Sequence, residues 1–445
     1  MKITIVGAGR VGMHLAKYLS AEHQDIIIVD EDAGKLSALD ADFNLMTVAG
    51  NPTGFRTLRE ARAAEADLFI AVTPVTAENI VACATARSMG ARRTVARVDR
   101  YDYIDARNSA VVKGMGVDKV IFPEFLAAQS IIGALDHSWA THWYEFDHGE
   151  IIMIGVELGG EAPIAGLPLR ELSSISGAFH VSAVRRDHST IIPRGDYRPQ
   201  SGDVVFVTTT RGGVEKVMEL TGKWNREIRR VVVAGGNLIA ELVGLEAPKR
   251  YDITIIEKDA ERCRYLARKC GRCSIINGDA GENDVLIEAG IAAADAFIAL
   301  SDGAAGNILA CLTASEVGVA KTIAEIEREQ YIAKAETFGI GTIINKQLIA
   351  SNTIFQMMID ADSSSSKCLA LTDAEVARLE VRDGSFLTSG AVRDLRLPSE
   401  LTFAGMIRDG RGVLVTGDTR FKPHDQVLVF CLGGALHKVE KLFNR

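Results

Sequence analysis

The sequence of 445 residues carries one pattern twice, and this duplication constrains the fold more than any single motif. The segment "EADLFIAVTPVTAENIVACATARSMGARRTVARVDRYDYI" at 65–104 matches "AADAFIALSDGAAGNILACLTASEVGVAKTIAEIEREQYI" at 293–332, so that residue 65 meets residue 293, an offset of 228. Upstream, "VAGNPTGFRTLREA" matches "INGDAGENDVLIEA" at the same offset. A repeat of this length predicts that one domain type is built twice.

Short apolar runs alternate with segments of helical spacing in each copy, which is the pattern of βαβ units. In the first copy the strand-like runs are "KITIVG", "DIIIVD", "NLMTVAG", "DLFIAVT", "RTVARV" and "KVIFP". Parallel strands joined by right-handed crossovers form a doubly wound sheet. The sequence therefore predicts an α/β protein with two tandem Rossmann-like domains.

A different pattern follows each of these units: short strands between Gly, Pro and Asp turns. "EIIMIGVEL", "HVSAVRR", "STIIPRGD" and "GDVVFVTTT" have the counterparts "VARLEVRDGSFL", "TFAGMIRDG", "RGVLVTGD" and "HDQVLVFCL". We expect one small α+β domain used twice. "DADSSSSKC", 360–368, is predicted to be a flexible linker. The expected order is large, small, large, small, with boundaries at 1–137, 141–222, 228–356 and 367–445.

The first copy opens with a Gly-rich loop, "GAGRVG", set between an apolar strand and a helix and followed by a strand that ends in Asp30. In this context Gly7 permits a tight turn, Gly9 lets the backbone approach a pyrophosphate and Gly12 permits close packing of helix on strand. Free amides at the helix start then hold phosphate. Asp30 is placed to accept hydrogen bonds from a ribose, and the next residue, Glu31, would repel a 2′-phosphate. NAD(H) or an adenine nucleotide is therefore favoured over NADP. The alternative is a Gly-rich turn that binds nothing.

The second copy opens with "VVVAGGNLIAEL". Aligned on the first loop at an offset of 227, it has Ala234 and Ile239 in place of the first and third glycines and keeps Gly236 at the close-approach position. Ile in place of Gly predicts that helix and strand are pushed apart and that the loop geometry differs. Glu257 keeps the ribose acceptor. The second site is therefore either a structural relic or a weaker, altered nucleotide site.

Further candidates lie where the fourth and fifth strands end, at the edge where open sheets bind ligands. Thr73 and Pro74 follow the fourth strand, and Asn79 begins the next helix. Arg97 ends the fifth strand and is a candidate phosphate contact, although an ordinary surface arginine is an equal alternative. Its partner in the repeat is Glu325, of opposite charge. If Arg97 contacts phosphate, the second site has lost that contact.

The residues expected to contact nucleotide occupy matching places in the two copies. In the first copy they are Gly7, Ala8, Gly9, Arg10, Val11, Gly12, Asp30, Gly50, Asn51, Thr73, Pro74, Arg97 and Val98. In the second they are Ala234, Gly235, Gly236, Asn237, Leu238, Glu257 and Asp279. No catalytic or metal-binding residue is predicted. Cys270 and Cys273 have CxxC spacing, but no further ligand stands nearby, so two ordinary thiols are expected.

Charge and apolar patterning exclude several classes of function. Fifty basic and fifty-eight acidic residues give a net charge of −8, so no nucleic-acid partner is expected. No uninterrupted apolar run reaches about 18 residues, the minimum length of a membrane-spanning helix. We therefore expect a chain that neither crosses a membrane nor leaves the cytosol. Seven cysteines, an odd number in a long chain, fit reduced thiols.

The whole chain resembles the TrkA family, regulatory subunits of bacterial Trk potassium uptake systems that are built from RCK domains, regulators of potassium conductance. "GAGRVG", "IVD", "AVT", "EN", "ARV" and the double repeat carry the resemblance. The sequence departs from the family pattern at Asp99, where a basic residue is common, and at Ala234 and Ile239. The resemblance implies binding of NAD(H) and adenine nucleotides such as ATP or ADP.

The same resemblance implies a place in the cell and a set of partners. It implies a cytoplasmic protein, peripheral on the inner face of the cell membrane, that gates an integral-membrane potassium transporter subunit of the Trk type. It also implies a homo-oligomer whose RCK units close into a ring, for which two or four chains are expected.

Two other functions remain open from the sequence. A nicotinamide-dependent oxidoreductase would need an acid or base near the nicotinamide. His180 and His188 are available, but neither is repeated in the second copy. A free-standing nucleotide sensor without a membrane partner is the other alternative.

Overall fold

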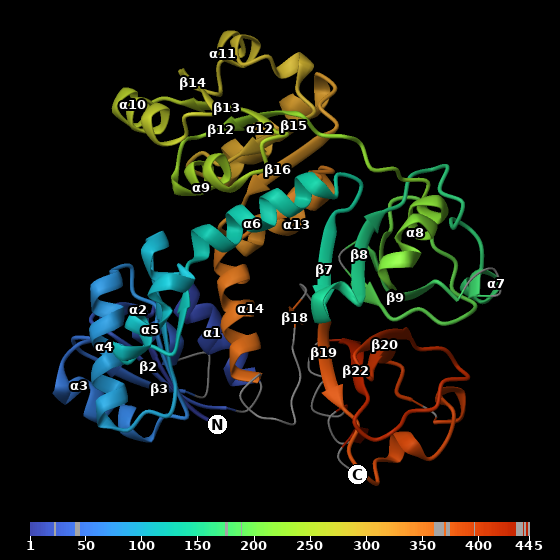
Figure 1. Ribbon diagram of the computed structural model, residues 1–445, viewed down its shortest axis with the longest axis horizontal. Coiled ribbons are helices and arrows are strands. Elements are labelled where there is room, and N and C mark those ends of the chain that lie inside the picture. The colour runs from blue at the N-terminus through green and yellow to red at the C-terminus, as the bar shows by residue number, and fades with distance from the viewer. Residues whose placement is uncertain are drawn as a thin grey trace. The chain divides into compact units, whose positions relative to one another are not determined.

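The computed structural model, shown in Figure 1, describes most of the chain. The predicted linker at 360–368 and the candidate His188 lie outside the described residues. Those described are 1–21, 24–40, 45–173, 177–187, 189–359, 369–370, 374–395, 397–432, 439 and 442–443. Within these ranges the chain forms four sheets, two of six strands and two of five.

The first six-stranded sheet is parallel and has the order β3-β2-β1-β4-β5-β6. Its strands are β1 (Lys2–Val6), β2 (Asp25–Asp30), β3 (Met46–Ala49), β4 (Leu68–Ala71), β5 (Thr94–Arg97) and β6 (Lys119–Ile121). The helices are α1 (Arg10–Ala21), α2 (Ala33–Asp40), α3 (Phe55–Glu60), α4 (Thr76–Met89), α5 (Ser109–Gly114) and α6 (Pro123–Asp136). The strand order reverses between β1 and β4, and such a switch point opens a crevice at the carboxyl ends of the strands.

The second six-stranded sheet repeats this topology in the order β14-β13-β12-β15-β16-β17. Its strands are β12 (Arg230–Ala234), β13 (Asp252–Glu257), β14 (Ser274–Asn277), β15 (Ala296–Ala299), β16 (Lys321–Glu325) and β17 (Thr342–Ile344). The helices are α9 (Leu238–Glu246), α10 (Ala260–Lys269), α11 (Asn283–Glu288), α12 (Ala304–Glu316), α13 (Glu329–Thr337) and α14 (Lys346–Ile359). The predicted pair of Rossmann-like sheets is confirmed.

Matching residues build the two parallel-sheet cores. Because helices cover both faces of a parallel sheet, its strands read as continuous apolar runs rather than as alternating ones. Phe69 in β4 and Phe297 in β15 are both fully buried, as are Cys83 in α4 and Cys311 in α12. These pairs keep the offset of 228, so the duplication preserves the packing as well as the strand order.

Each parallel-sheet segment is followed by a five-stranded sheet with antiparallel pairing. The first has the order β10-β9-β11-β8-β7, from β7 (His142–Phe146), β8 (Ile151–Glu157), β9 (Phe179–Arg186), β10 (Ser189–Ile191) and β11 (Val204–Thr209), with helices α7 (Leu169–Ser173) and α8 (Val214–Thr221). The second has the order β18-β19-β22-β20-β21, from β18 (Leu369–Ala370), β19 (Ala374–Glu380), β20 (Leu401–Arg408), β21 (Arg411–Leu414) and β22 (Gln426–Leu432).

The two small sheets share an apolar core. The rings of Phe206 in β11 and Phe430 in β22 lie 6.1 Å apart between centroids. His180 is half-buried at this junction with Nε2 3.1 Å from Thr402 Oγ1, and desolvation lowers the pKa of His180 to about 4. This histidine therefore packs one small sheet against the other.

The chain divides into two compact units that do not follow the sequence order. One comprises 1–127 with 345–358, and the other comprises 128–344 with 359–445. Helix α14 thus belongs to the unit of the first parallel sheet, although it follows the last strand of the second sheet along the chain.

Candidate functional site

The first Gly-rich loop is held by contacts that exclude side chains. Gly7 has φ +103°, and a Cβ atom there would lie 2.9 Å from the backbone nitrogen of Thr73. A Cβ atom at Gly12 would lie 1.9 Å from the carbonyl oxygen of Gly7, so α1 approaches the loop too closely for any side chain. Helix α1 begins at Arg10, directly after the loop. The first amides of a helix lack a partner within the helix itself, and such amides can bind an anion.

Asp30, at the end of β2, closes the base of this loop. Its Oδ2 accepts the N–H of Ala8 at 2.7 Å, and its Oδ1 accepts the N–H of Asp32 at 2.9 Å. Lys35 Nζ lies 3.4 Å from Oδ1. The carboxylate is thus fixed beside the Gly-rich loop, where a Rossmann acid meets a ribose.

The second loop has the same backbone contacts. Gly235 has φ +99° and donates its N–H to Ile256 O at 2.9 Å, as Gly7 donates to the strand beside it. The N–H of Gly236 donates to Glu257 Oε2 at 2.7 Å, and the N–H of Asp259 donates to Oε1 at 2.8 Å. Glu257 therefore holds its loop in the way that Asp30 holds the first.

These contacts correct the alignment of the second loop by one residue. Ala234 is the last residue of β12, as Val6 is of β1, and Ile239 corresponds to Val11, both buried in their helices. Ala240, not Ile239, takes the place of the third glycine. The predicted separation of helix and strand by Ile is therefore wrong. The physical reason is the left-handed φ at the start of the loop, which Gly235 adopts at low cost and Ala does not.

Asn237 is the main difference between the two loops. It is the N-cap of α9, and its Oδ1 accepts the N–H of Ala240 at 3.1 Å. Its Nδ2 donates to Leu300 O at 2.9 Å and lies 3.2 Å from Glu325 Oε2. At the matching Gly9, a Cβ atom would meet no described atom within 4 Å. The side chain of residue 237 thus covers a helix amide in the second copy, whereas Gly9 has no side chain to do so in the first.

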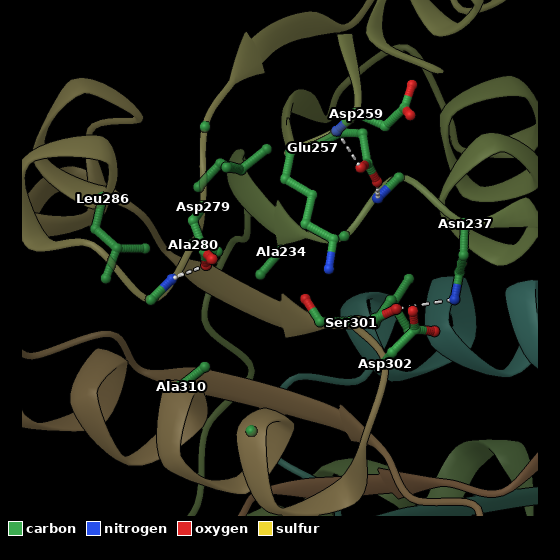
Figure 2. Close-up of a pocket in the computed structure, with 18 of the residues that line it drawn as sticks. Ala234, Asn237, Glu257, Asp259, Asp279, Ala280, Leu286, Ser301, Asp302 and Ala310 are labelled. Atoms are coloured by element: carbon green, nitrogen blue, oxygen red, sulfur yellow. Dashed lines mark hydrogen bonds between the residues drawn. The ribbon is translucent and has the colours of Figure 1, made fainter. Parts of the chain in front are cut away.

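A cavity of about 520 Å³ surrounds the second loop, within the usual size range of small-ligand sites (Figure 2). Arg262 lines the cavity and links the loop to α9, because the Arg262 guanidinium donates to Gly236 O at 2.6 Å and to Glu241 Oε2 at 2.8 Å. The lining comprises Ala234, Gly235, Gly236, Asn237, Ile256, Glu257, Lys258, Asp259, Arg262, Gly278, Asp279, Ala280, Gly281, Asn283, Leu286, Leu300, Ser301, Asp302, Gly306, Leu309, Ala310 and Thr313. The predicted candidate Leu238 is not part of it.

A buried asparagine ties two strand ends together in each copy, a role that the sequence reading missed. Asn79 Nδ2 donates to Thr73 O and to Arg97 O, both at 2.9 Å. Asn307 Nδ2 likewise lies 2.9 Å from the carbonyl oxygens of Ser301 and Glu325. The match of the two asparagines at the repeat offset was the signal available in the sequence. The clamp sets the distance between neighbouring strand ends at the edge where ligands bind.

Arg97 and Glu325 occupy the same place with opposite charge. Arg97 Nη2 lies 3.3 Å from Glu124 Oε1, and its buried Nε has no partner among the described residues. The Arg97 side chain is 23% exposed. The Glu325 side chain is buried beside Asn237. The same place at this edge therefore holds a guanidinium group in the first copy and a buried carboxyl group in the second.

The remaining candidates lie around the same edges. Gly50 donates its N–H to Asp30 O at 3.0 Å, and Asn51 Nδ2 donates to Glu31 Oε1 at 2.9 Å. Pro74 is exposed next to Thr73. The Val98 side chain is fully buried, so that residue offers a ligand its backbone only.

The described part of the chain lacks two further features. There, no group of three or more His, Cys, Asp or Glu side chains is arranged to hold a metal ion. In the same ranges, no helix is both long and apolar enough to cross a membrane.

Comparison with known families agrees with the duplicated geometry. The TrkA-N domain model matches 3–123 and 231–346, and the TrkA-C domain model matches 153–222 and 376–444. The chain belongs to the TrkA family. It therefore contains two TrkA-N and two TrkA-C domains in alternation, which are RCK domains.

Relatives and solved structures extend over the whole chain. The Trk system potassium uptake protein TrkA of Azorhizobium caulinodans is 27% identical over 451 residues, covering 100% of this chain and 98% of that protein. The TrkA homolog of Archaeoglobus fulgidus is also 27% identical, covering 100% of both chains. The crystal structure of the GsuK RCK domain matches with a TM-score of 0.62 at 16% identity, covering 100% of this chain and 95% of that one. A GsuK channel bound to NAD matches with a TM-score of 0.61 at 15% identity, covering 100% and 79%.

Family membership decides between the classes of function that the sequence left open. The TrkA family consists of regulatory, non-enzymatic proteins, so the oxidoreductase alternative is wrong. The position of His180 between the two small sheets agrees with this, because that histidine is engaged in packing.

Proposed function

We propose that the chain is the nucleotide-responsive regulatory subunit of a potassium uptake system. It binds NAD(H) at the loop of the first parallel sheet and an adenine nucleotide, more weakly, at the loop of the second. The observation that carries the proposal is the pair of loops in which an acidic side chain, Asp30 or Glu257, accepts a loop amide next to a helix N-terminus. The NAD-bound GsuK channel, which has a similar fold, supports this choice of ligand.

The two sites are proposed to differ in their affinity for phosphate. The first loop has Gly9 where the second has Asn237, so residue 9 offers no side chain to cover an α1 amide, and Arg97 lies at the neighbouring strand end. The second loop has Asn237 over one α9 amide and buried Glu325 beside it. Phosphate is favoured by open amides and cations and opposed by a buried carboxylate. The first site should therefore bind a dinucleotide more tightly.

Partners and location follow from the family as parts of the same proposal. The relatives are named Trk system potassium uptake proteins, so the proposed partner is an integral-membrane potassium transporter subunit of the Trk type. The chain would bind it on the cytoplasmic face of the membrane and would assemble as a dimer or tetramer whose RCK units form a closed ring. A nucleotide then gates the transporter only through its different affinities for two states of the ring.

Calorimetric titration of the purified chain with NAD, NADH, ATP and ADP tests the proposal. We expect one tight phase with NAD or NADH and a weaker phase with an adenine nucleotide. The control variant is Asp25→Asn, which changes an exposed acid at the opposite end of β2 from the loop. No binding of any of the four nucleotides would contradict the proposed sites.

Co-sedimentation separates a transporter subunit from a free-standing sensor. Membranes that contain a Trk-type transporter should retain the chain, and membranes without it should not. Equal recovery from the two membranes would favour the free-standing sensor. Light scattering should give the mass of two or four chains, and a monomer at working concentration would contradict the ring.

A further inference from the structure

Two cysteines of the second parallel-sheet domain form a turn suited to a disulfide. Cys270 is the C-cap of α10, and Cys273 directly precedes β14. The N–H of Cys273 donates to Cys270 O at 2.8 Å. Such a four-residue turn brings its end Cα atoms within about 7 Å. Disulfides span about 4.4–6.8 Å between Cα atoms, so the turn permits one without moving the backbone far.

Both sulfur atoms of this turn enter one space beside Gly244 of α9. A Cβ atom at Gly244 would lie 3.0 Å from Cys273 Sγ and 3.2 Å from Cys270 Sγ. Cys270 Sγ is 3.6 Å from Glu241 O, and Cys273 Sγ is 3.9 Å from Gly244 O. The absence of a side chain at Gly244 therefore lets the two sulfurs converge on the helix backbone.

The first copy lacks every part of this arrangement. Ala16 stands where the second copy has Gly244, and the matching segment, 31–45, contains no cysteine. The buried thiols Cys83 and Cys311, in contrast, are retained in both copies. The thiol pair and the glycine that accommodates it thus occur together and only in the second copy.

The two thiols differ in reactivity. Cys273 is half-buried, and the hydrogen bond from Cys270 lowers its pKa. Cys270 is buried, and its hydrogen bond to Cys273 together with burial raises its pKa. The thiolate is the attacking form of cysteine. Cys273 is therefore the thiol that reacts first with an oxidant in solution.

We propose that Cys270 and Cys273 are a reversible redox-modification site that closes to an intramolecular disulfide by exchange with a low-molecular-weight disulfide such as glutathione disulfide. The Cys273 thiolate attacks one sulfur of glutathione disulfide and releases one glutathione thiolate. Cys270 then loses its proton to solvent, attacks the Cys273 sulfur and releases the second. Two protein thiols are oxidised to one disulfide, and glutathione disulfide is reduced to two glutathione molecules, which take up the protons.

The oxidation state is linked to the second nucleotide site through α9. A disulfide has no S–H group to donate to Glu241 O or Gly244 O, so α9 loses both contacts. The side chain of Glu241 also holds Arg262, which binds the loop at Gly236 O. Oxidation should therefore weaken nucleotide binding in the second cavity by about threefold, the loss of a fraction of one hydrogen bond. This consequence rests on the proposed function, whereas the disulfide itself does not.

Mass spectrometry of the full-length chain tests the disulfide. The reduced protein is equilibrated in buffers with increasing ratios of glutathione disulfide to glutathione, then quenched with acid, denatured and alkylated. Trypsin is avoided for the digestion because it would cut at Arg272, between the two cysteines. We expect the peptide that holds both cysteines to lose two hydrogen atoms and to carry no alkyl group, while Cys263 and Cys311 become fully alkylated. The proposal is overturned if both cysteines stay alkylated across the series, or if the wild-type chain stops at a glutathione adduct on Cys273.

Variants test the order of attack and the role of Gly244. Cys270→Ser should accumulate a glutathione adduct at Cys273, and Cys273→Ser should leave Cys270 reduced. Gly244→Ala should displace the sulfurs and shift the glutathione ratio at half-oxidation by about threefold or more, whereas the matched change Ala16→Gly should not shift it. An adduct on Cys270 in Cys273→Ser, or equal behaviour of Gly244→Ala and Ala16→Gly, would contradict the proposal.

A nucleotide titration in reduced and oxidised buffer tests the link to α9. We expect weaker binding of the second phase after oxidation and no change in a Cys270→Ser, Cys273→Ser double variant. Loss of binding in both buffers would contradict the proposed function, and the mass measurement decides the disulfide independently.

Discussion

The two Gly-rich loops share their backbone contacts and differ in what covers the start of the helix. In both, a glycine with positive φ begins the loop and an acidic side chain accepts the next amide. Gly9 has no side chain to cover an α1 amide, whereas Asn237 caps α9 with its own side chain. The duplicated fold thus keeps the backbone contacts that shape each loop, while the side chain at one position, Gly9 or Asn237, differs at the start of the helix. Three measurements test this comparison, and one further measurement compares the two parallel sheets that carry the loops.

The largest effect is expected where α1 touches the loop. Gly12→Val places methyl groups where even a Cβ atom lies 1.9 Å from Gly7 O. The helix must move, and we expect a loss of about 3 kcal/mol in the stability of the first unit. Thermal unfolding measures it. The matched variant Ala240→Gly should cost about 1 kcal/mol or less, the usual penalty of Gly in a helix. Equal losses would show that the two helix starts pack alike.

The acidic side chains give the next largest effect. Asp30→Ala removes the acceptor that holds Ala8 N–H and is placed for the ribose. Loss of a charge-assisted hydrogen bond of about 1.5–3 kcal/mol predicts about ten- to a hundredfold weaker NAD(H) binding. Glu257→Ala should leave this tight phase unchanged and affect only a weaker one. Calorimetric titration of both variants decides, and equal losses would contradict the proposed difference between the sites.

A buried lysine gives the two sheets different pH dependence. Lys321 is buried with Nζ 2.8 Å from Ala140 O, while the matching Arg93 is only half-buried. Burial lowers the pKa of Lys321 to about 8 from an ordinary 10.5. Because the unfolded chain then binds more protons between these pH values, stability should rise by about 2–3 kcal/mol from pH 8 to pH 10.5. Denaturant unfolding at several pH values measures the slope.

The control for this slope is Lys321→Met, which keeps an unbranched apolar side chain without the charge. It should remove the part of the pH dependence that comes from Lys321, while tyrosine and cysteine titration remains. An unchanged slope in Lys321→Met would mean that the ammonium group is solvated in the folded chain.

The smallest effect is expected from exchanging the helix caps. Asn237→Gly should uncover the Ala240 amide and strengthen binding of an adenine nucleotide in the second cavity by about three- to tenfold, at a few tenths of a kcal/mol in stability. Gly9→Asn is sterically permitted, since its Cβ atom meets nothing described within 4 Å. It should weaken the first site by a similar factor. Calorimetric titration of both variants with nucleotide tests this prediction. If both substitutions changed nucleotide affinity in the same direction, the proposed role of the two residues would be refuted.

Much of the site could be predicted from the sequence, but the second Gly-rich loop was aligned on the first with an error of one residue. The acids and the strand ends follow from a repeat that keeps an offset of 228 over most of its length. The offset is 227 at Glu257, and extending that value back to the loop placed Ala234 at a position that requires positive φ. Only the backbone shows that Gly235 holds this position. The pairing of Arg97 with Glu124 was equally invisible, because those residues belong to different elements.

The sequence by itself determined the duplication, the order of large and small domains and the doubly wound, parallel character of the two large sheets. Such features arise from local apolar periodicity and short right-handed connections, which are encoded within a few tens of residues. The tertiary structure alone decided which helix amide a side chain caps and which side chains converge, as with Asn237 over its helix and the two thiols beside Gly244. These features depend on contacts between elements far apart in the chain, and differences of a few tenths of an ångström decide whether a side chain fits.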